Sequence, residues 1–429
     1  MQGLIRTTTL SLTLVATTTW ADTHFVAPGQ SIQAAVDAAA DGDVIELGAG
    51  EHLGSVELMA RDLRFQGQGP DSTVWRGNNS GMVDSTYSNV EFDGITFADG
   101  QGTQDGLFLR GGAMFFVGGT ADIVNCAFQN NTAKGGGAIA ANNADLNIAH
   151  STFLANKLNG GLEGGEVILS IFSYLNLDSC EFEQNGWGST GFAYGTVESV
   201  YGDLTATNCY FYNNRSTRSG AFSVNSGDAT LAHCTFVENH PYANYAYDAD
   251  VTYLNSLFMF NGGSDTSAGA NLNTASSIQY GGCVVQDQQM IDSQGDNPPL
   301  GVENLVVDAP ESVEIFGFLA LADSPVIRSL ATGCDNLYPN LDSIPDTDLT
   351  GAPRPWSRMV GAIEHATGSE SNQCLADLNE DTTVDYQDLI LLISRWGVTD
   401  TFDPADRDAD GFIGLPELMM MLSDWGDCS

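Results

Sequence analysis

Hydrophobic and polar positions in the middle of the chain repeat as a unit, and each copy contains the motif Phe-x-x-Asn. A Cys or Ser stands two positions before each Phe, and the repeated residues are Phe128, Phe153, Phe182, Phe211, Phe236 and Phe258. They are separated by 25, 29, 29, 25 and 22 residues. The segments between them are rich in Gly, Asn and β-branched residues and have no long stripe of helical period, which predicts strands and turns. A repeated unit of this length predicts a solenoid.

If each unit is one turn of a parallel β-helix, successive coils stack about 4.8 Å apart and equivalent residues lie above one another. The Cys or Ser and the Phe then share the core face, and the residue between them points outward: Ala127, Thr152, Glu181, Tyr210, Thr235 and Leu257. The Asn of each motif is expected at the following corner, in the left-handed conformation, with its amide bonded to the Asn above and below. This predicted ladder consists of Asn131, Asn156, Asn185, Asn214, Asn239 and Asn261.

A second strand is predicted after each glycine turn. Aligned by distance to the Phe, its inward row reads Ile139, Ile168, Val197 and Phe222, and its outward row reads Ala140, Leu169, Glu198 and Ser223. A slip of one residue would exchange the two faces. The outward row contains one carboxylate, so no acidic cluster of the kind a lyase or hydrolase needs is predicted there. At the N-terminal end, residues 31–40 predict a short capping helix with Ile32, Val36 and Ala39 on one side.

The net charge of the chain excludes one class of binding partner. Among 429 residues, 55 are acidic and 14 basic, which gives a net charge of −41. We expect no nucleic-acid partner, because such binding needs a basic surface. Arg6 and the following Leu/Val/Thr stretch predict a signal peptide, residues 1–21, cleaved after Ala21. We therefore expect a secreted, extracellular or cell-surface protein with no transmembrane segment.

Cysteine use in an exported protein raises the question of disulfides. Cys126, Cys180, Cys209 and Cys234 occupy the inward position of the repeat, and we interpret them as buried thiols. The remaining four cysteines give two candidate disulfides, Cys374 with Cys428 and Cys283 with Cys334.

The acidic C-terminal segment contains a second repeat, with a period of 29 residues. Oxygen ligands at loop positions 1, 3, 5 and 12, with a backbone carbonyl at position 7, are the EF-hand arrangement for Ca²⁺. The candidate ligands are Asp377, Asn379, Asp381, Thr383 and Asp388 in the first loop, and Asp406, Asp408, Asp410, Phe412 and Glu417 in the second. Thr382 replaces the usual Gly of the first loop. Val384 and Ile413, at position 8, could pair the two loops through a short bridge.

Two adjacent loops are candidates for binding a glycan. Arg215 and Arg218 lie on one corner loop, and the next loop carries Tyr242, Tyr245, Tyr247, Asp248 and Asp250. Tyr rings stack on sugar faces, and Arg pairs with uronate or sulfate groups through two hydrogen bonds. The alternative is that these are solvated loop residues in local ion pairs.

The segment from Phe25 to His52, the sequence GGGAI and the Phe-x-x-Asn repeats together resemble the right-handed parallel β-helix proteins, whose architecture is shared with pectate lyases. Residues 323–366 look like the segment that closes the helix in secreted bacterial members. The C-terminal repeat resembles the dockerin module, a calcium-dependent docking unit of secreted polysaccharide-degrading systems. These resemblances imply a mainly β protein: a right-handed parallel β-helix of about a dozen coils over residues 22–365, a linker at 366–373, and a small all-α calcium-loop domain at 374–429.

Three functions remain open from the sequence. The first is an exported calcium-binding protein without catalysis, either a polysaccharide-binding protein or a surface scaffold, which the lack of a carboxylate cluster favours. The second is a polysaccharide lyase or glycoside hydrolase with an unfamiliar site, which the resemblance to the fold favours. The third is an assembly component whose C-terminal module docks to a cohesin-like protein or folds back on its own β-helix.

Overall fold

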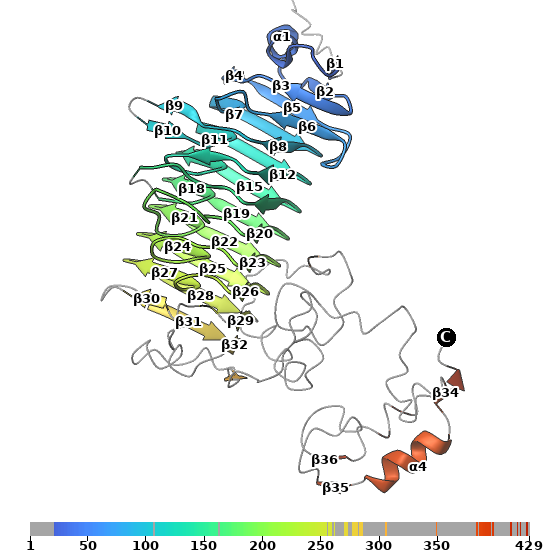
Figure 1. Cartoon of the computed structure of the whole chain (residues 1–429). Coiled ribbons are helices and arrows are strands. Elements are labelled where there is room, and N and C mark those ends of the chain that lie inside the picture. Colours follow the sequence, from blue (N-terminus) through green and yellow to red (C-terminus); the bar gives the residue numbers. More distant parts are fainter. Residues whose placement is uncertain are drawn as a thin grey trace, which may run out of the picture.

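The chain winds into a parallel β-solenoid of about nine turns, seen as a stack of coils in Figure 1. The structure, a computed structural model, describes residues 21–105, 108–161 and 164–254 as continuous stretches and shorter pieces beyond them. We expected about a dozen coils from residues 22–365. Much of the chain after residue 254, including nearly all of the predicted closing segment and the whole linker, lies outside the described residues.

Each turn contributes strands to three faces. The first face contains β4 (Val56–Met59), the first halves of β7 (Val83–Asp93) and β11 (Met114–Val124), β14 (Ile139–Asn142), β18 (Ile168–Ile171), β21 (Val197–Val200), β24 (Phe222–Asn225), β27 (Asn244–Tyr247) and β30 (Ala270–Leu272). The second contains β1 (Thr23–Val26), β2 (Val44–Leu47), β5 (Asp62–Gln66), the second halves of β7 and β11, β15 (Asp145–Ala149), β19 (Leu175–Asp178), β22 (Leu204–Thr207), β25 (Asp228–Ala232), β28 (Asp250–Leu254) and β31 (Ser277–Gly281).

The third face is a separate parallel sheet. It contains β3 (Gly50–Leu53), β6 (Thr73–Arg76), β8 (Thr96–Ala98), β12 (Ala127–Gln129), β16 (Thr152–Leu154), β20 (Glu181–Glu183), β23 (Tyr210–Tyr212), β26 (Thr235–Val237), β29 (Leu257–Met259), β32 (Val284–Val285) and β33 (Leu305–Val306). Two small pairs flank the faces within residues 103–158: antiparallel β9 (Thr103–Asp105) with β10 (Phe108–Arg110), and parallel β13 (Thr132–Ala133) with β17 (Lys157–Leu158).

The core confirms the predicted phenylalanine stack. Every Phe of the motif pairs in register with the Phe of the next coil, beginning one coil earlier at Phe97. Neighbouring rings are parallel to within 17°, with centroids 4.6 to 5.2 Å apart. The inward row of the first face is also confirmed, because Ile139, Ile168, Val197 and Phe222 align and are buried.

The asparagine ladder is confirmed, but its backbone conformation differs from our prediction. Each ladder amide donates to the Phe carbonyl of the preceding coil, and the first five also donate to the side-chain oxygen of the next Asn. Asn185 Nδ2, for example, lies 2.9 Å from Asn214 Oδ1 and 2.9 Å from Phe153 O. The left-handed conformation belongs to the residue before each of the first five ladder asparagines: Asn130, Ala155, Gln184, Asn213 and Glu238. That residue makes the turn, so the Asn itself can point its amide into the stack.

The repeated cysteines are buried thiols, as predicted. Cys126, Cys180, Cys209 and Cys234 are at most 2% exposed and unbridged. Their Sγ atoms lie within hydrogen-bond reach of backbone carbonyls in their own or the preceding coil. The outward row between Cys and Phe is less uniform than we expected: Thr152 is exposed, whereas Tyr210 and Leu257 are 5% and 7% exposed.

A short helix covers the N-terminal edge of the solenoid, as the sequence predicted (Figure 1). Helix α1 (Ile32–Ala38) begins after Ser31, whose hydroxyl accepts a hydrogen bond from the N–H of Ala34 at 3.2 Å. Ile32 and Val36 are buried in the core. The helix therefore protects backbone groups that would otherwise form an open sheet edge.

The described pieces of the C-terminal segment are helix α4 (Tyr386–Ser394) and four two-residue strands. β34 (Thr383–Val384) pairs antiparallel with β37 (Gly426–Asp427), and β35 (Gly397–Val398) pairs antiparallel with β36 (Phe412–Ile413). The suggested bridge from Val384 to Ile413 is therefore wrong, since their partners are Gly426 and Gly397. These partners are related by the 29-residue repeat, so each position-8 residue pairs with the segment that follows the other loop.

Candidate functional site

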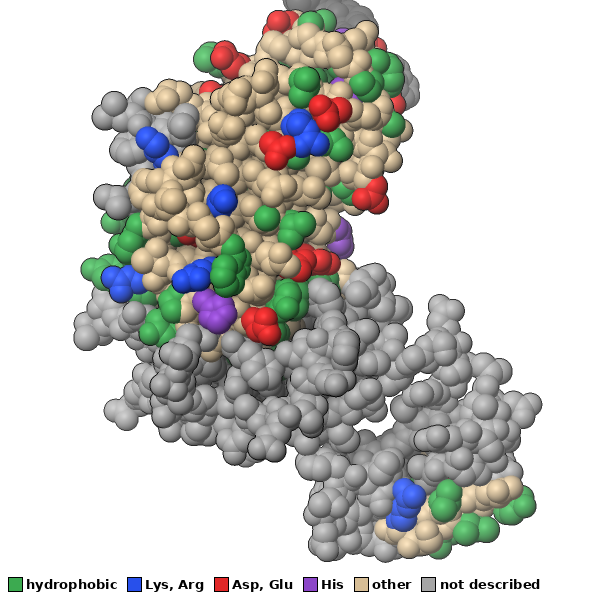
Figure 2. Space-filling model, in the orientation of Figure 1, with side chains coloured by type: hydrophobic (Ala, Val, Ile, Leu, Met, Phe, Trp, Pro, Cys, Tyr) green, Lys and Arg blue, Asp and Glu red, His purple; other side chains and the backbone are tan. Residues whose placement is uncertain are grey.

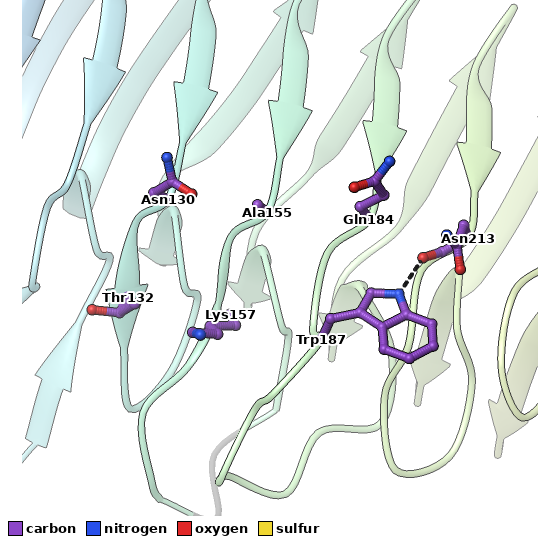
Figure 3. Close-up of a pocket in the computed structure, with 7 residues that line it drawn as sticks. All are labelled: Asn130, Thr132, Ala155, Lys157, Gln184, Trp187 and Asn213. Carbon is purple, nitrogen blue, oxygen red and sulfur yellow. Dashed lines mark hydrogen bonds between the residues drawn. The ribbon is translucent and has the colours of Figure 1, made fainter.

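A groove of about 640 Å³ lies on the corner that follows the third face, and we call it the corner groove. Its lining residues are Asn130, Thr132, Ala155, Lys157, Gln184, Trp187 and Asn213. Figure 3 shows them as two rows across successive coils. One row consists of the left-handed corner residues that precede the ladder asparagines. The repeat therefore positions the groove, although its lining side chains do not repeat.

Trp187 is the aromatic side chain of the corner groove. Its Nε1–H donates to the carbonyl of Asn213 at 2.7 Å, the contact drawn in Figure 3. The guanidinium carbon of Arg215 lies 5.1 Å from the indole centroid, and the ring of His240 lies 6.4 Å away, edge to face. The indole is thus fixed at one end while its side chain stays 42% exposed. Such a ring can stack on a sugar.

Cations near the groove differ from those at the N-terminal coils. Arg61, Arg64 and Arg76 each form an ion pair with Asp or Glu. Lys157 and Arg215, in contrast, form no ion pair within 4.0 Å among the described residues. Lys157 acts on the buried carboxyl of Glu166 only from beyond that distance, where it opposes the rise of the Glu166 pKa. In Figure 2, Lys and Arg side chains gather on one side of the lower coils. In a protein of net charge −41, both cations can therefore pair with an anionic group.

A chain of aromatic contacts connects the second predicted arginine to the first face. The guanidinium of Arg218 lies 5.9 Å from the centroid of Phe192, and that ring contacts Tyr194 at 5.2 Å. Tyr194 in turn contacts Tyr245 on β27 at 5.6 Å. The structure therefore brings Arg218 and Tyr245 together through residues of the preceding loop, while Arg215 lies at the corner groove.

The other predicted glycan residues lie elsewhere on the solenoid. Tyr247 ends β27 and is 46% exposed, and Asp248 forms the next corner with φ of 50°. Asp250 begins β28 on the second face, in register with Asp228 on the adjacent strand β25. Tyr242 is half-buried, and its carbonyl accepts the N–H of Gly220. The predicted set is thus divided between two corners, because the chain crosses the first face between Tyr242 and Asp248.

Two buried carboxyl groups lie beside the loops of this region. Burial raises the pKa of Glu198 to about 7, although the N–H groups of Tyr194 and Gly165 oppose the shift. Its Oε2 has no hydrogen-bond partner among the described residues. Burial likewise raises the pKa of Glu166 to about 7, while its Oε2 accepts the N–H of Leu158 at 2.9 Å. Both groups can therefore hold a proton near neutral pH.

Our sequence reasoning missed Trp187 and Lys157. They lie on two different loops with no common motif, so they do not appear as a group along the chain. Counting from the ladder would have found them: Lys157 follows Asn156 by one residue, and Trp187 follows Asn185 by two. Residues at these offsets leave the same corner on successive coils.

Of the predicted calcium ligands, the structure describes Thr383, Asp388 and Phe412. Thr383 and Phe412 lie on β34 and β36, where their carbonyls would serve as position-7 ligands. Asp388 lies in the first turn of α4 and is buried. The donor set consists of carboxylate, amide and carbonyl oxygens, which fits Ca²⁺. Asp377, Asn379, Asp381, Asp406, Asp408, Asp410 and Glu417 lie outside the described residues.

The candidate disulfides stay predictions. Cys283 is buried, and its sulfur accepts the N–H of Ser256 at 3.5 Å. Cys334, Cys374 and Cys428 lie outside the described residues.

Comparison with known proteins gives a partial likeness. No family model matches the chain. A stretch of 176 residues is 33% identical to the Metabotropic glutamate receptor-like protein R of Dictyostelium discoideum, covering 39% of this chain and 10% of that protein. This coverage is too small to assign the chain to a family. Within the described part of the chain, no helix has the length and apolar character of a membrane span.

Proposed function

We propose that this protein is an exported β-solenoid scaffold that binds an acidic polysaccharide at the corner groove without cleaving it. The observation that carries the proposal is the exposed indole of Trp187 beside Arg215 and Lys157, two cations without a carboxylate ion pair among the described residues. An aromatic face and cations together suit a sugar chain that bears anionic groups.

Binding and cleavage are tested with one set of ligands. The mature protein is incubated with plant and marine polyuronates and sulfated glycans, and binding is followed by affinity electrophoresis and chain length by size exclusion. We expect retardation by at least one anionic polymer without shortening of it. Trp187→Ala and Arg215→Gln should each weaken the retardation, whereas Arg76→Gln, at an ion pair on β6, should not. Equal retardation of all variants would contradict binding at the corner groove.

We further propose that the C-terminal repeat is a dockerin-like module that binds one or two Ca²⁺ ions and attaches the scaffold to a cohesin-like partner. The reciprocal pairing of β34 with β37 and of β36 with β35 supports a module of two equivalent halves. Bound Ca²⁺ would supply the charge that draws the loop oxygens together. Calorimetric titration of the full chain should show this binding. Asp388→Asn should weaken Ca²⁺ binding at the first site, and Asp410→Asn at the second. Unchanged Ca²⁺ binding by both variants would contradict the assignment.

An enzyme acting on the same polymer is the second candidate. The observation that favours it is the pair of protonatable carboxyl groups, Glu166 and Glu198, because a general acid must hold its proton at the working pH. Shortening of a polymer by the wild-type protein would establish this function. Glu166→Gln and Glu198→Gln would then show whether either carboxyl takes part.

A further inference from the structure

The residues that follow the ladder asparagines form a regular row, which we call the cation row. It consists of Thr132, Lys157, Gly186, Arg215 and His240, one on each successive coil. In the last four, the backbone N–H donates to the carbonyl of the ladder Asn one coil earlier, at 2.8 to 3.1 Å. Because the ladder fixes the backbone of each coil, the spacing of side chains along the row is set by the coil height.

Glycine stands in the row between the two cations. Gly186 has φ of +76°, and a Cβ there would lie 1.7 Å from the carbonyl oxygen of Arg215. A side chain is therefore excluded at this level without a backbone shift. Lys157 and Arg215 lie two coils apart along the ladder, roughly 9–10 Å along the axis at about 4.8 Å per coil, with no side chain of the row between them.

Trp187 occupies the level between the two cations. Its ring is fixed by Asn213 and lies against Arg215. On the other side, a Cβ on Gly188 would lie 3.7 Å from Lys157 Nζ, so the ammonium group reaches the same short loop. Figure 3 shows Lys157 and Trp187 on neighbouring coils, with the indole extending toward Asn213. The order along the solenoid axis is therefore cation, aromatic ring, cation.

We propose that the corner groove binds an extended polysaccharide running along the solenoid axis, with an anionic group facing the protein on every second sugar. One coil advances about 4.8 Å, which is close to the length of one sugar in an extended chain. Lys157 and Arg215 then pair with uronate or sulfate groups on alternate sugars, and the sugar between them stacks on Trp187. This inference rests on the proposed function, binding of an acidic polysaccharide at this groove.

The test uses trisaccharides of equal charge and different charge spacing. One isomer carries anionic groups on sugars 1 and 3, the other on sugars 1 and 2, in a sulfate series and a uronate series. Calorimetry with the full chain should give about tenfold tighter binding of the 1,3 isomer in at least one series, which also identifies the anionic group. Lys157→Gln and Arg215→Gln should each abolish this preference. Lys157→Arg, which keeps the charge, should retain it.

Lys134→Gln is the matched control, because it removes one positive charge from a neighbouring loop outside the cation row. It should preserve the preference for the 1,3 isomer. Equal affinity of the two isomers in both series would overturn the spacing inference while leaving polysaccharide binding intact. A preference that survives in both Lys157→Gln and Arg215→Gln would also overturn it. Failure to bind any anionic glycan, including the polymers, would refute the proposed function itself.

Discussion

Removing one asparagine side chain from the ladder should destabilise the solenoid far more than the small volume of that side chain suggests. Asn185 makes four side-chain hydrogen bonds. Its Nδ2 donates to Phe153 O and Asn214 Oδ1, each at 2.9 Å, and its Oδ1 accepts from the backbone N and the Nδ2 of Asn156 at 2.9 and 3.2 Å. Asn185→Ala removes all four and leaves buried groups of the adjacent coils without partners.

The size of this destabilisation follows from the free-energy cost of lost hydrogen bonds and of buried polar groups without partners. A buried hydrogen bond contributes about 1 kcal/mol net, and a stranded donor or acceptor costs about 1–3 kcal/mol, so we expect a loss of about 4 kcal/mol in the free energy of unfolding. Asn176→Ala is the control in the same coil, since Asn176 is exposed on β19 and accepts one bond, from Thr205. It should change stability by about 0.5 kcal/mol or less.

Urea-induced unfolding, followed by far-ultraviolet circular dichroism, measures both variants. Asn185→Asp adds a second comparison, because it keeps the shape and replaces two donors by an acceptor that faces Phe153 O and Asn214 Oδ1. It should be at least as destabilising as Asn185→Ala. If Asn185→Ala loses no more stability than Asn176→Ala, the ladder does not hold the corners together and the reasoning is refuted.

Two further predictions concern the core and the buried acid. Phe182→Ala, within the ring stack, should lower the free energy of unfolding in urea by about 3–5 kcal/mol. Phe172→Ala, at a ring 58% exposed, should lower it by less than about 1 kcal/mol. Similar losses in the two variants would argue against the stack as the main stabilising element. Because the folded pKa of Glu198 is raised from 4.5 to about 7, the folded state holds a proton that the unfolded state releases. The stabilisation that this bound proton gives the folded state is therefore fully present below pH 4.5, and the free energy of unfolding falls by about 3 kcal/mol as the pH rises to about 7. The stability difference between wild type and Glu198→Gln, measured from pH 4 to 8, should follow this fall, and a flat difference would contradict it.

The sequence predicted the frame of the solenoid because its core positions repeat. The Phe and Asn residues occupy identical environments in each coil, so the same side chain is selected there again and again. The corner conformation was misplaced by one residue because the αL position tolerates several residue types, and it is filled here by Asn130, Ala155 and Gln184. A position with no fixed side chain leaves no repeated signal.

The candidate site was less predictable than the frame. Arg215 stands out in the sequence because cations are rare in this chain, but its partner Trp187 lies on another loop and is brought near by stacking of the coils. The outward row of the first face was also only partly predictable. Glu198 lies on the outward side, as the sequence predicted, yet it is buried beneath residues 164 and 165. Loops with no shared motif cover the outer face, so exposure could not be derived from strand alternation.

The coil register of the cation row fixes the distance between its two charges in steps of one coil. Excising residues 186–214, one whole coil, would place Arg215 directly after Asn185 and one level from Lys157 instead of two. The distance between the two charges would then fall in a single step of about 4.8 Å. Any change of spacing along this axis must occur in whole coils, because the stacked rings and ladder amides admit no intermediate register.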